Sequence, residues 1–423
     1  AAYDRLLRSE LLGPCSPEPT RHGGTERSRE DELLVTPERR AGLFRYKCQL
    51  EDDQGPMSLS PTPLRTSKTH DAPPRKPARK IPQEPFRVLH APGLSDDYYL
   101  SLLDYSSEDV LAVGLGSCID LWNARSGRAE RLSNLGSGTT VASVKWASRV
   151  HHRSSQGSEA LAVGTSDGKV QIWDAAVGKK VRTLKGHHRR VGALAWADGS
   201  STLFTGAQDR DILRWDLRSG SCEPANRLRG HGQEVCGLDW SQDWQSLASG
   251  GNEGGVCVWS GRSSSPDLRL GEHEAAVKAV AWSPSTRGLL ATGGGTADKS
   301  VRLWNTSVGA QVAVSPTGSQ VCNLAWSPAC DGELISTHGY SGNEVVLWRH
   351  QPGGLSRLHT SKWHQARVLY MAVSPDGQTV VTGTGNETLC FWNLLAACKP
   401  RATSLGTLST SISTTSALNC TIR

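Results

Sequence analysis

Short stretches in which apolar and polar residues alternate recur along most of the chain, separated by turns rich in Gly, Asp and Ser. In the segment 191–216 one alternating stretch ends at Trp196, a second follows, and a third closes on Trp215-Asp216 after a turn at Asp209. Alternation with a period of two is typical of β-strands that bury one face. Each such segment therefore predicts a small antiparallel sheet.

The closing tryptophan of this unit recurs at a nearly constant interval. A Gly-His pair opens the units at Gly186-His187 and Gly230-His231, and in both the His precedes the closing Trp by 28 residues. A period of about 40–45 residues with Gly-His and Trp-Asp marks is typical of WD-repeat β-propeller blades. Seven closing tryptophans predict seven blades: Trp122, Trp173, Trp215, Trp259, Trp304, Trp348 and Trp392.

The start of the repeat region predicts how the ring closes. The segment 86–89 alternates like a strand, and the segment 98–105 is expected to be the first strand of blade one. We expect the 86–89 strand to complete the seventh blade, because closure removes the free sheet edges of a linear array. The fold class predicted is thus all-β, a seven-bladed WD-repeat propeller over 85–398.

The two ends of the chain differ from the repeats. Residues 1–84 lack Trp and are rich in Pro, Ser, Arg and Glu, so we expect a largely disordered segment with Ser/Thr-Pro dipeptides that a kinase could phosphorylate. Its basic cluster at 75–80 is either a nuclear import signal or a solvated charge run. Residues 399–423 are rich in Ser and Thr and predict a flexible tail that ends in Ile422-Arg423.

Composition narrows the function classes. The net charge of +6 is small for 423 residues and does not favour nucleic acid, and no long apolar run predicts a membrane span. The eleven cysteines show no metal-ligand spacing, which favours buried free thiols in a reducing compartment. Neither a metal nor another cofactor is expected.

One set of residues resembles a catalytic triad. His187, Thr205 and Asp209 combine an imidazole, a hydroxyl and an acid, and the set recurs as His231, Ser249 and Glu253 and as His273, Thr292 and Asp298. Repetition from blade to blade favours a structural network that satisfies polar groups between strands. Blades one and six carry Gly116 and Gly342 at the acid position, so we expect them to depend on apolar packing instead.

Several motifs resemble a known family. They are residues 233–238 (QEVCGL), 273–282 (HEAAVKAVAW), 293–298 (GGGTAD), 318–326 (GSQVCNLAW) and 367–369 (RVL). Together they resemble the fizzy and fizzy-related proteins, and upstream segments such as 10–13 and 42–44 favour the fizzy-related branch. The family's Asp-Arg-aromatic-Ile-Pro docking box does not occur in the sequence.

The resemblance implies a function in protein degradation. Fizzy-type proteins are non-catalytic coactivators of the anaphase-promoting complex, a ubiquitin ligase of the cell cycle, and bring it substrates that carry short degradation motifs. The implied partners are subunits of that complex, degron-bearing substrates such as cyclins, and inhibitor proteins with pseudo-degrons, in the nucleus and cytoplasm. The alternatives are a generic WD-repeat scaffold without a ligase role and, less favoured, an enzyme that uses the central channel.

The resemblance also implies two motif-binding sites and a docking end. Six positions match the family's receptor for the Lys-Glu-Asn motif, and their loops are expected on one face of the propeller. The destruction-box site would use Leu89, His90 and Glu387, with His90 where the family usually has Asp, so destruction-box peptides are expected to bind weakly. Ile422 and Arg423 would dock on a ligase subunit, and residues 1–84 would form a disordered regulatory or ligase-docking segment. The six Lys-Glu-Asn positions are Asp97, Tyr98, Asn252, Thr296, Gln320 and Arg367.

Overall fold

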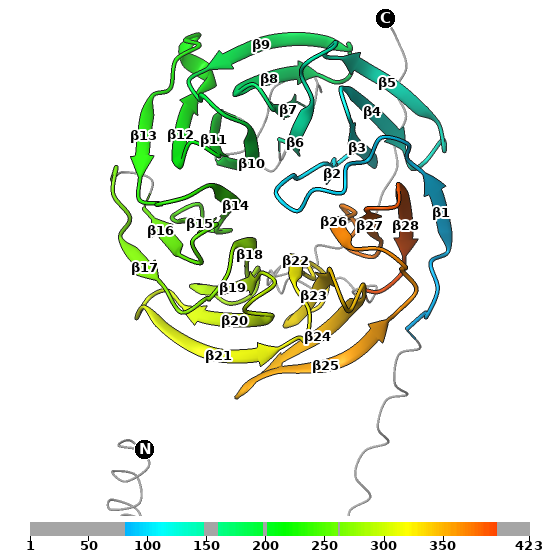
Figure 1. Cartoon of the computed structure of the whole chain (residues 1–423), viewed down its shortest axis with the longest axis vertical. Helices are drawn as coiled ribbons and strands as arrows, with labels where there is room; N and C mark the ends of the chain where they lie inside the picture. The colour runs from blue at the N-terminus through cyan, green and yellow to red at the C-terminus, as the bar shows by residue number, and fades with distance from the viewer. Residues whose placement is uncertain (1–80, 148–159, 198–200, 261–262, 396–423) are drawn as a thin grey trace, which may run out of the picture. The chain divides into compact units, whose positions relative to one another are not determined.

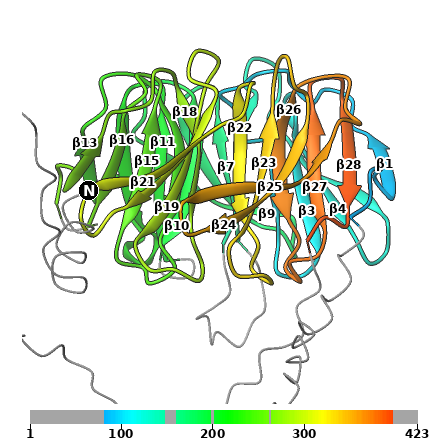
Figure 2. The ribbon, with the colours of Figure 1, turned by 90° about the horizontal axis from the view of Figure 1, so that it is seen from below.

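Seven four-stranded antiparallel sheets surround a central channel in the computed structural model, which describes residues 81–147, 160–197, 201–260 and 263–395 (Figure 1). Seen from the side, the strands of the sheets stand next to one another around the ring (Figure 2). The predicted seven-bladed all-β propeller is confirmed. The expectations for residues 1–80 and 396–423, including Ile422 and Arg423, lie outside the described residues.

The first four blades each follow the chain from the innermost strand outward. Blade one is β2 (Leu103–Tyr105), β3 (Val110–Leu115), β4 (Cys118–Asn123) and β5 (Ala129–Asn134), and blade two is β6 (Val141–Trp146), β7 (Ala160–Thr165), β8 (Lys169–Asp174) and β9 (Lys179–Lys185). Blade three is β10 (Val191–Ala197), β11 (Thr202–Ala207), β12 (Asp211–Asp216) and β13 (Asn226–Arg229), with a 3-10 turn at Leu217–Ser219. Blade four is β14 (Val235–Trp240), β15 (Leu247–Gly251), β16 (Val256–Trp259) and β17 (Leu268–Leu270).

Blades five and six repeat this order, and blade seven takes its outer strand from the start of the propeller. Blade five is β18 (Val277–Trp282), β19 (Leu289–Gly294), β20 (Ser300–Asn305) and β21 (Ala310–Pro316). Blade six is β22 (Val321–Trp326), β23 (Glu333–His338), β24 (Val345–Gln351) and β25 (Gly354–Ser361). Blade seven is β26 (Val368–Val373), β27 (Val380–Thr384), β28 (Thr388–Trp392) and β1 (Arg87–His90).

The predicted closure strand is present. β1 pairs antiparallel with β28, with Arg87 opposite Phe391 and His90 opposite Thr388. The Phe86 ring packs edge-on against Phe391 at 6.3 Å, and Phe391 also contacts Trp122 of blade one at 4.8 Å. The first strand of the propeller therefore joins its last blade and packs this joint against blade one.

Neighbouring blades pack through close contacts between their two inner strands. A Cβ on Gly206 of β11 would lie 2.6 Å from Cγ1 of Val235, which begins the inner strand of the next blade. Real Cβ atoms do not approach so closely, so this position needs a glycine for the blades to meet. The closing tryptophans fill the space behind these contacts, and Trp259, Trp304 and Trp392 are fully buried.

The repeated His, hydroxyl and acid set is the predicted structural network. In blade three the Trp215 Nε1–H donates to Thr205 Oγ1 at 2.9 Å, and that hydroxyl lies 2.7 Å from His187 Nε2. His187 Nδ1 is 3.0 Å from an oxygen of Asp209. The set satisfies buried polar atoms of one blade and is assembled in the same way in blades four and five.

The expectation for blade one agrees with the structure, but that for blade six is wrong. Trp122 of blade one packs against Phe391 and Arg87. In blade six Trp348 Nε1 donates to Ser336 Oγ at 2.7 Å, and His338 Nε2 lies 2.7 Å from the same hydroxyl. The histidine comes from β23 itself instead of the usual Gly-His position, so the spacing of the other blades does not reveal it.

The histidine of blade six predicts a loss of stability in acid. Burial, with a contribution from Arg357, lowers the pKa of His338 to about 4. Between pH 6.5 and 4 the unfolded chain binds a proton there that the folded chain does not, so stability falls as the pH is lowered through this window. The loss should reach about 1.5 kcal/mol between pH 6.5 and 5. Urea unfolding of His338→Gln should show a flatter pH dependence, whereas the exposed His188→Gln should match the wild type.

One strand expectation needs correction. The segment 98–105 is not a single strand, because β2 begins only at Leu103. Ser101 instead makes a parallel bridge to Ser143 of blade two, and a Cβ on Gly192 of blade three would lie 2.7 Å from the Tyr99 carbonyl oxygen. The chain before β2 therefore crosses the channel instead of following the blade (Figure 1). Alternation alone could not reveal this, since the apolar residues of the loop are buried against several blades.

Candidate functional site

The loop before β2, residues 94–102, forms the floor of the candidate site. The Tyr98 hydroxyl lies 3.3 Å from the carbonyl oxygens of Ala276 and Val321, which precede or begin the inner strands of blades five and six. From blade seven, Tyr370 donates to the carbonyl oxygen of Ser95 at 2.7 Å. Burial raises the pKa of both tyrosines, so both remain protonated donors. These bonds fix the loop to the far side of the channel.

The predicted Lys-Glu-Asn residues lie on loops of one face. Gln320 and Arg367 directly precede the inner strands β22 and β26. Asn252 lies between β15 and β16, and Thr296 lies between β19 and β20. In an antiparallel blade the start of the first strand and the turn from the second to the third strand share one edge. The structure therefore brings these loops to the same mouth of the channel as Asp97.

Asp97 is held by an ionic network that the sequence analysis did not identify. Arg190 Nη1 lies 3.1 Å from Asp97 Oδ2, while its Nε and Nη2 bind both oxygens of Glu234 at 2.8 and 2.9 Å. The guanidinium also stacks over the Tyr99 ring at 5.1 Å. Hydrogen bonding to Glu234 raises the pKa of Arg190. The Asp97 side chain keeps 32% of its surface exposed, so a second cation can still reach it.

Arg367 is paired with a residue that was also missed. Its Nε lies 3.0 Å from Asp96 Oδ1, and its Nη2 donates to the Asp96 carbonyl oxygen at 2.8 Å. The guanidinium stacks over the Tyr340 ring at 4.9 Å. The Asp96 side chain is 42% exposed, so this ion pair is open to solvent and a carboxylate from a ligand can compete with it.

The remaining four predicted residues differ in exposure. Asn252 accepts from the Tyr99 hydroxyl at 2.9 Å and donates to Gln233 at 2.8 Å. Thr296 is exposed, whereas Tyr98 and Gln320 are 6% and 7% exposed. Tyr98 and Gln320 therefore shape the floor, and the exposed or half-buried side chains are left to contact a ligand.

A positional rule would have found two of the missed residues. Arg190 directly precedes β10, and Glu234 directly precedes β14. They thus occupy the same place in their blades as Gln320 and Arg367 do in theirs. Reading this position in every blade, and not only where the family resemblance points, identifies the Asp97–Arg190–Glu234 network.

The predicted destruction-box residues lie together at the joint between β1 and β28. Leu89 is half-buried in β1, and His90 is exposed at its end. Glu387 lies beside them, because its carbonyl oxygen accepts from the Ala91 N–H at 2.8 Å. Its carboxylate accepts from the Gly93 N–H at 2.8 Å, which holds the side chain at this edge. The three residues lie together, and the His90 imidazole occupies the position at which the sequence resemblance implies an Asp.

Other chemistry is limited in the described part of the chain. It holds no cluster of three or more His, Cys, Asp or Glu side chains suited to a metal ion, and no helix there is long and apolar enough to cross a membrane. The described cysteines are free thiols, four of them buried and Cys222 exposed. The mouth of the channel presents charged groups, amides and aromatic faces.

Comparison with known proteins agrees with this architecture. The family described as CDC20/Fizzy WD40 domain matches residues 89–392. Protein FIZZY-RELATED 2 of Arabidopsis thaliana is 47% identical over 405 residues, which cover 95% of this chain and 78% of that protein. Anaphase-promoting complex subunit cdh1 of Dictyostelium discoideum is 44% identical over 378 residues, which cover 82% of this chain and 48% of that protein.

A solved structure matches the same region. A chain in the crystal structure of the mitotic checkpoint complex is similar with a TM-score of 0.71 and 43% identity, over 78% of this chain and 98% of that chain. The blade repeat, the closure by β1 and the sequence match over 89–392 point to one family. The chain belongs to the CDC20/Fizzy family of WD40-domain proteins, with fizzy-related proteins among its relatives.

Proposed function

We propose that this protein is a substrate adaptor and coactivator of the anaphase-promoting complex, and that it binds Lys-Glu-Asn and destruction-box motifs. The observation that carries the proposal is the pair of opposite charges, Asp97 and Arg367, on one mouth of the channel. A relative 44% identical is itself named as a subunit of that complex, which supports the ligase part of the proposal.

The charges suit a short peptide with a Lys and a Glu next to each other. The Lys would join Arg190 as a second cation at Asp97, which is partly exposed. The Glu would exchange with Asp96 at the Arg367 guanidinium, whose planar fork suits carboxylates. The Asn would take amide bonds from Asn252, above the floor that Gln320 shapes. Because the loop at 94–102 is tied to three blades, little ordering is needed when the peptide binds.

Titration with the two kinds of peptide tests the motif assignment. We expect a Lys-Glu-Asn peptide to bind with unimpaired affinity and a destruction-box peptide to bind more weakly than the Lys-Glu-Asn peptide. A neutral His90 does not attract the Arg of the destruction box, and a protonated His90 repels it. His90→Asp should strengthen destruction-box binding about tenfold, the size of one added charged hydrogen bond. Fluorescence anisotropy of labelled peptides gives the dissociation constants.

Controls separate the two sites. His90→Asp should leave the Lys-Glu-Asn affinity unchanged, and Arg367→Ala should weaken only the Lys-Glu-Asn peptide. Arg287→Ala, which removes an exposed arginine paired with Asp243, should affect neither. An unchanged destruction-box affinity in His90→Asp would show that Glu387 alone suffices. If the full chain is purified from cell extract and no subunit of the anaphase-promoting complex is recovered with it, the scaffold alternative is favoured.

A further inference from the structure

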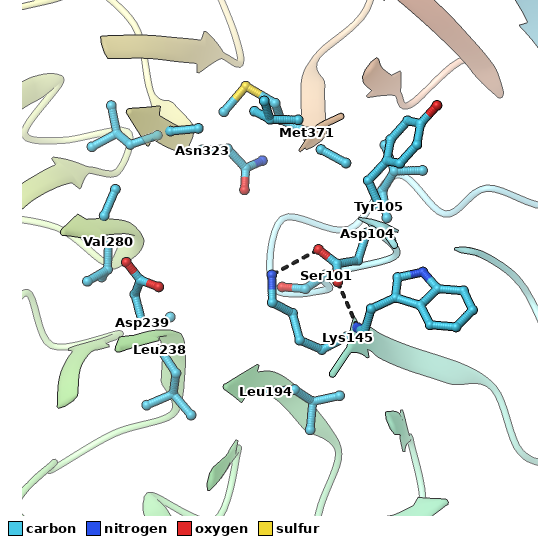
Figure 3. Close-up of a pocket in the computed structure, with 18 of the residues that line it drawn as sticks. Ser101, Asp104, Tyr105, Lys145, Leu194, Leu238, Asp239, Val280, Asn323 and Met371 are labelled. Atoms are coloured by element: carbon cyan, nitrogen blue, oxygen red, sulfur yellow. Dashed lines mark hydrogen bonds and ion pairs between the residues drawn. The ribbon is translucent and has the colours of Figure 1, made fainter. Parts of the chain in front are cut away.

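A cavity lies at the opposite end of the channel from the candidate site. The inner strands surround a cavity of about 600 Å³ near their C-terminal ends, and Ser101 of the 94–102 loop is one of the residues that line it (Figure 3). Its size falls in the range of small-molecule sites, roughly 300–1,000 Å³. Its walls carry both apolar and charged side chains, and none of them has a part in the motif binding proposed above.

One of the two acids in the cavity is fully paired. Asp104 Oδ1 lies 2.9 Å from Lys145 Nζ, and Asp104 Oδ2 accepts from the Trp146 backbone N–H at 2.7 Å (Figure 3). This ion pair neutralises both side chains, and the negative aspartate raises the pKa of Lys145. Neither group is left over to bind a charged ligand.

The other acid, Asp239, lacks such a partner. Its Oδ2 accepts from the Trp282 backbone N–H at 2.9 Å, and within the described ranges no lysine, arginine or histidine lies at ion-pair distance. Burial raises the pKa of Asp239 to about 6, against the smaller effect of the amide and of Lys145. The side chain points into the cavity (Figure 3). The cavity thus contains one carboxylate that needs a cation.

The surroundings of Asp239 define the shape of that cation. Asn323 donates its Nδ2–H to the Leu369 carbonyl oxygen at 2.5 Å, which leaves its amide oxygen directed into the cavity (Figure 3). Leu194, Leu238, Val280 and Met371 form apolar walls around it. Lys278 does not supply the charge, because its ammonium is held by the Leu369 carbonyl oxygen between the rings of Tyr98 and Tyr370.

We propose that this cavity binds a primary ammonium group carried on a short unbranched apolar chain, with Asp239 as its counter-ion. The ammonium has three donors, and the Asp239 carboxylate and the Asn323 amide oxygen supply acceptors for it. The carbon chain lies along the leucine, valine and methionine walls. A free alkylamine and the side chain of a peptidyl lysine share this chemistry.

The two methionines of the chain make a direct measurement available. The sequence contains only Met57 and Met371, and Met371 lines the cavity. Full-length protein labelled with ¹³C at the methionine methyl groups gives two NMR signals, which Met371→Leu assigns. Pentylamine at pH 7.5 should shift the Met371 signal saturably and leave the Met57 signal unchanged. Pentanol, of the same shape without the charge, should bind at least tenfold more weakly.

Variants identify the counter-ion. Asp239→Asn keeps an acceptor for the Trp282 N–H and should weaken pentylamine binding at least tenfold while pentanol binding stays the same. The unchanged pentanol response shows that the variant cavity is folded. Asp243→Asn removes a neighbouring acid that is exposed and paired with Arg287, and it should bind like the wild type. Equal affinity for amine and alcohol, or for wild type and Asp239→Asn, would overturn the proposal.

A pH series checks the same group without a substitution. Asp239 faces Lys145 on β6 and the Trp282 N–H on β18, with Asp104 on β2 and Lys278 on β18 as the other charged groups of the cavity. Because protonation removes its charge, amine affinity should fall about tenfold from pH 7.5 to pH 5. A pH-independent affinity would contradict the assignment. An Ala-rich pentapeptide with a central Lys, if it binds more tightly than pentylamine, identifies a peptide as the source of the ammonium, and weaker binding identifies a free amine.

Discussion

Replacing Leu89 by proline should lower the free energy of unfolding by about 1–3 kcal/mol, because it removes one of the hydrogen bonds that close the ring and leaves its acceptor without a donor. The Ala91 N–H donates to the Glu387 carbonyl oxygen, and Ala91 lies two residues beyond Leu89 on the same side of the ladder. In antiparallel pairs the bonded positions alternate, so the Leu89 N–H faces Leu389 in the same way. Proline has no N–H to donate there. Urea unfolding followed by tryptophan fluorescence measures the loss.

Val88→Pro is the matched control for this substitution. Val88 occupies the intervening pair with Cys390, so its N–H points away from β28 at the outer edge of the blade. Proline is tolerated at edge positions whose N–H faces solvent, and the expected loss is below about 1 kcal/mol. Equal losses for the two variants, or none for Leu89→Pro, would show that β1 does not hold the propeller closed.

The parts of the fold that depend on local pattern could be predicted from the sequence. Each blade repeats a strand alternation and a closing tryptophan, so Trp215 or Trp304 identifies its blade without knowledge of the rest. The closure by β1 followed from counting, since seven closing strands need seven outer strands and one was missing at the end of the chain. The loops that carry Gln320, Arg367, Asn252 and Thr296 followed from the same blade geometry.

The parts that depend on contacts across the channel could not be predicted in this way. The course of residues 98–102 is set by the bonds of Tyr98 to carbonyl groups about 180 and 220 residues away in sequence. The partner of Asp97 is likewise supplied by another blade, since Arg190 lies in blade three. The partner of Arg367 is Asp96, which lies in the loop before β2 and not in blade seven. In blade six His338 takes the place of the Gly-His histidine of the other blades. The network requires only an imidazole within hydrogen-bond distance of Ser336, and residues at more than one sequence position can meet that requirement.

Replacing Arg190 by alanine should cost about 3–5 kcal/mol of folding free energy, the range for removing one partner of a buried ion pair. Glu234 is 7% exposed, and Arg190 binds both of its oxygens. Without the guanidinium, Glu234 remains as a buried charge with no cation, and Tyr99 loses the group stacked on its ring. Arg190→Lys should recover only part of the loss, because a single ammonium cannot bind Glu234 with two bonds and also reach Asp97.

The double variant Arg190→Met, Glu234→Met distinguishes a buried charge from a general packing defect. Removal of both partners takes away the uncompensated charge and leaves apolar side chains, so most of the stability lost in Arg190→Ala should return. If the double variant is as unstable as Arg190→Ala, the loss comes from packing around Tyr99 and not from Glu234.

The same double variant also tests the motif site, because it keeps Asp97 but removes the Arg190 guanidinium that is paired with it. If Asp97 binds the Lys of the Lys-Glu-Asn motif, the peptide should bind this refolded variant at least as tightly as the wild type, since the Lys no longer shares the carboxylate with Arg190. A clear loss of peptide affinity in a stable double variant would instead show that Arg190 positions Asp97 for the motif.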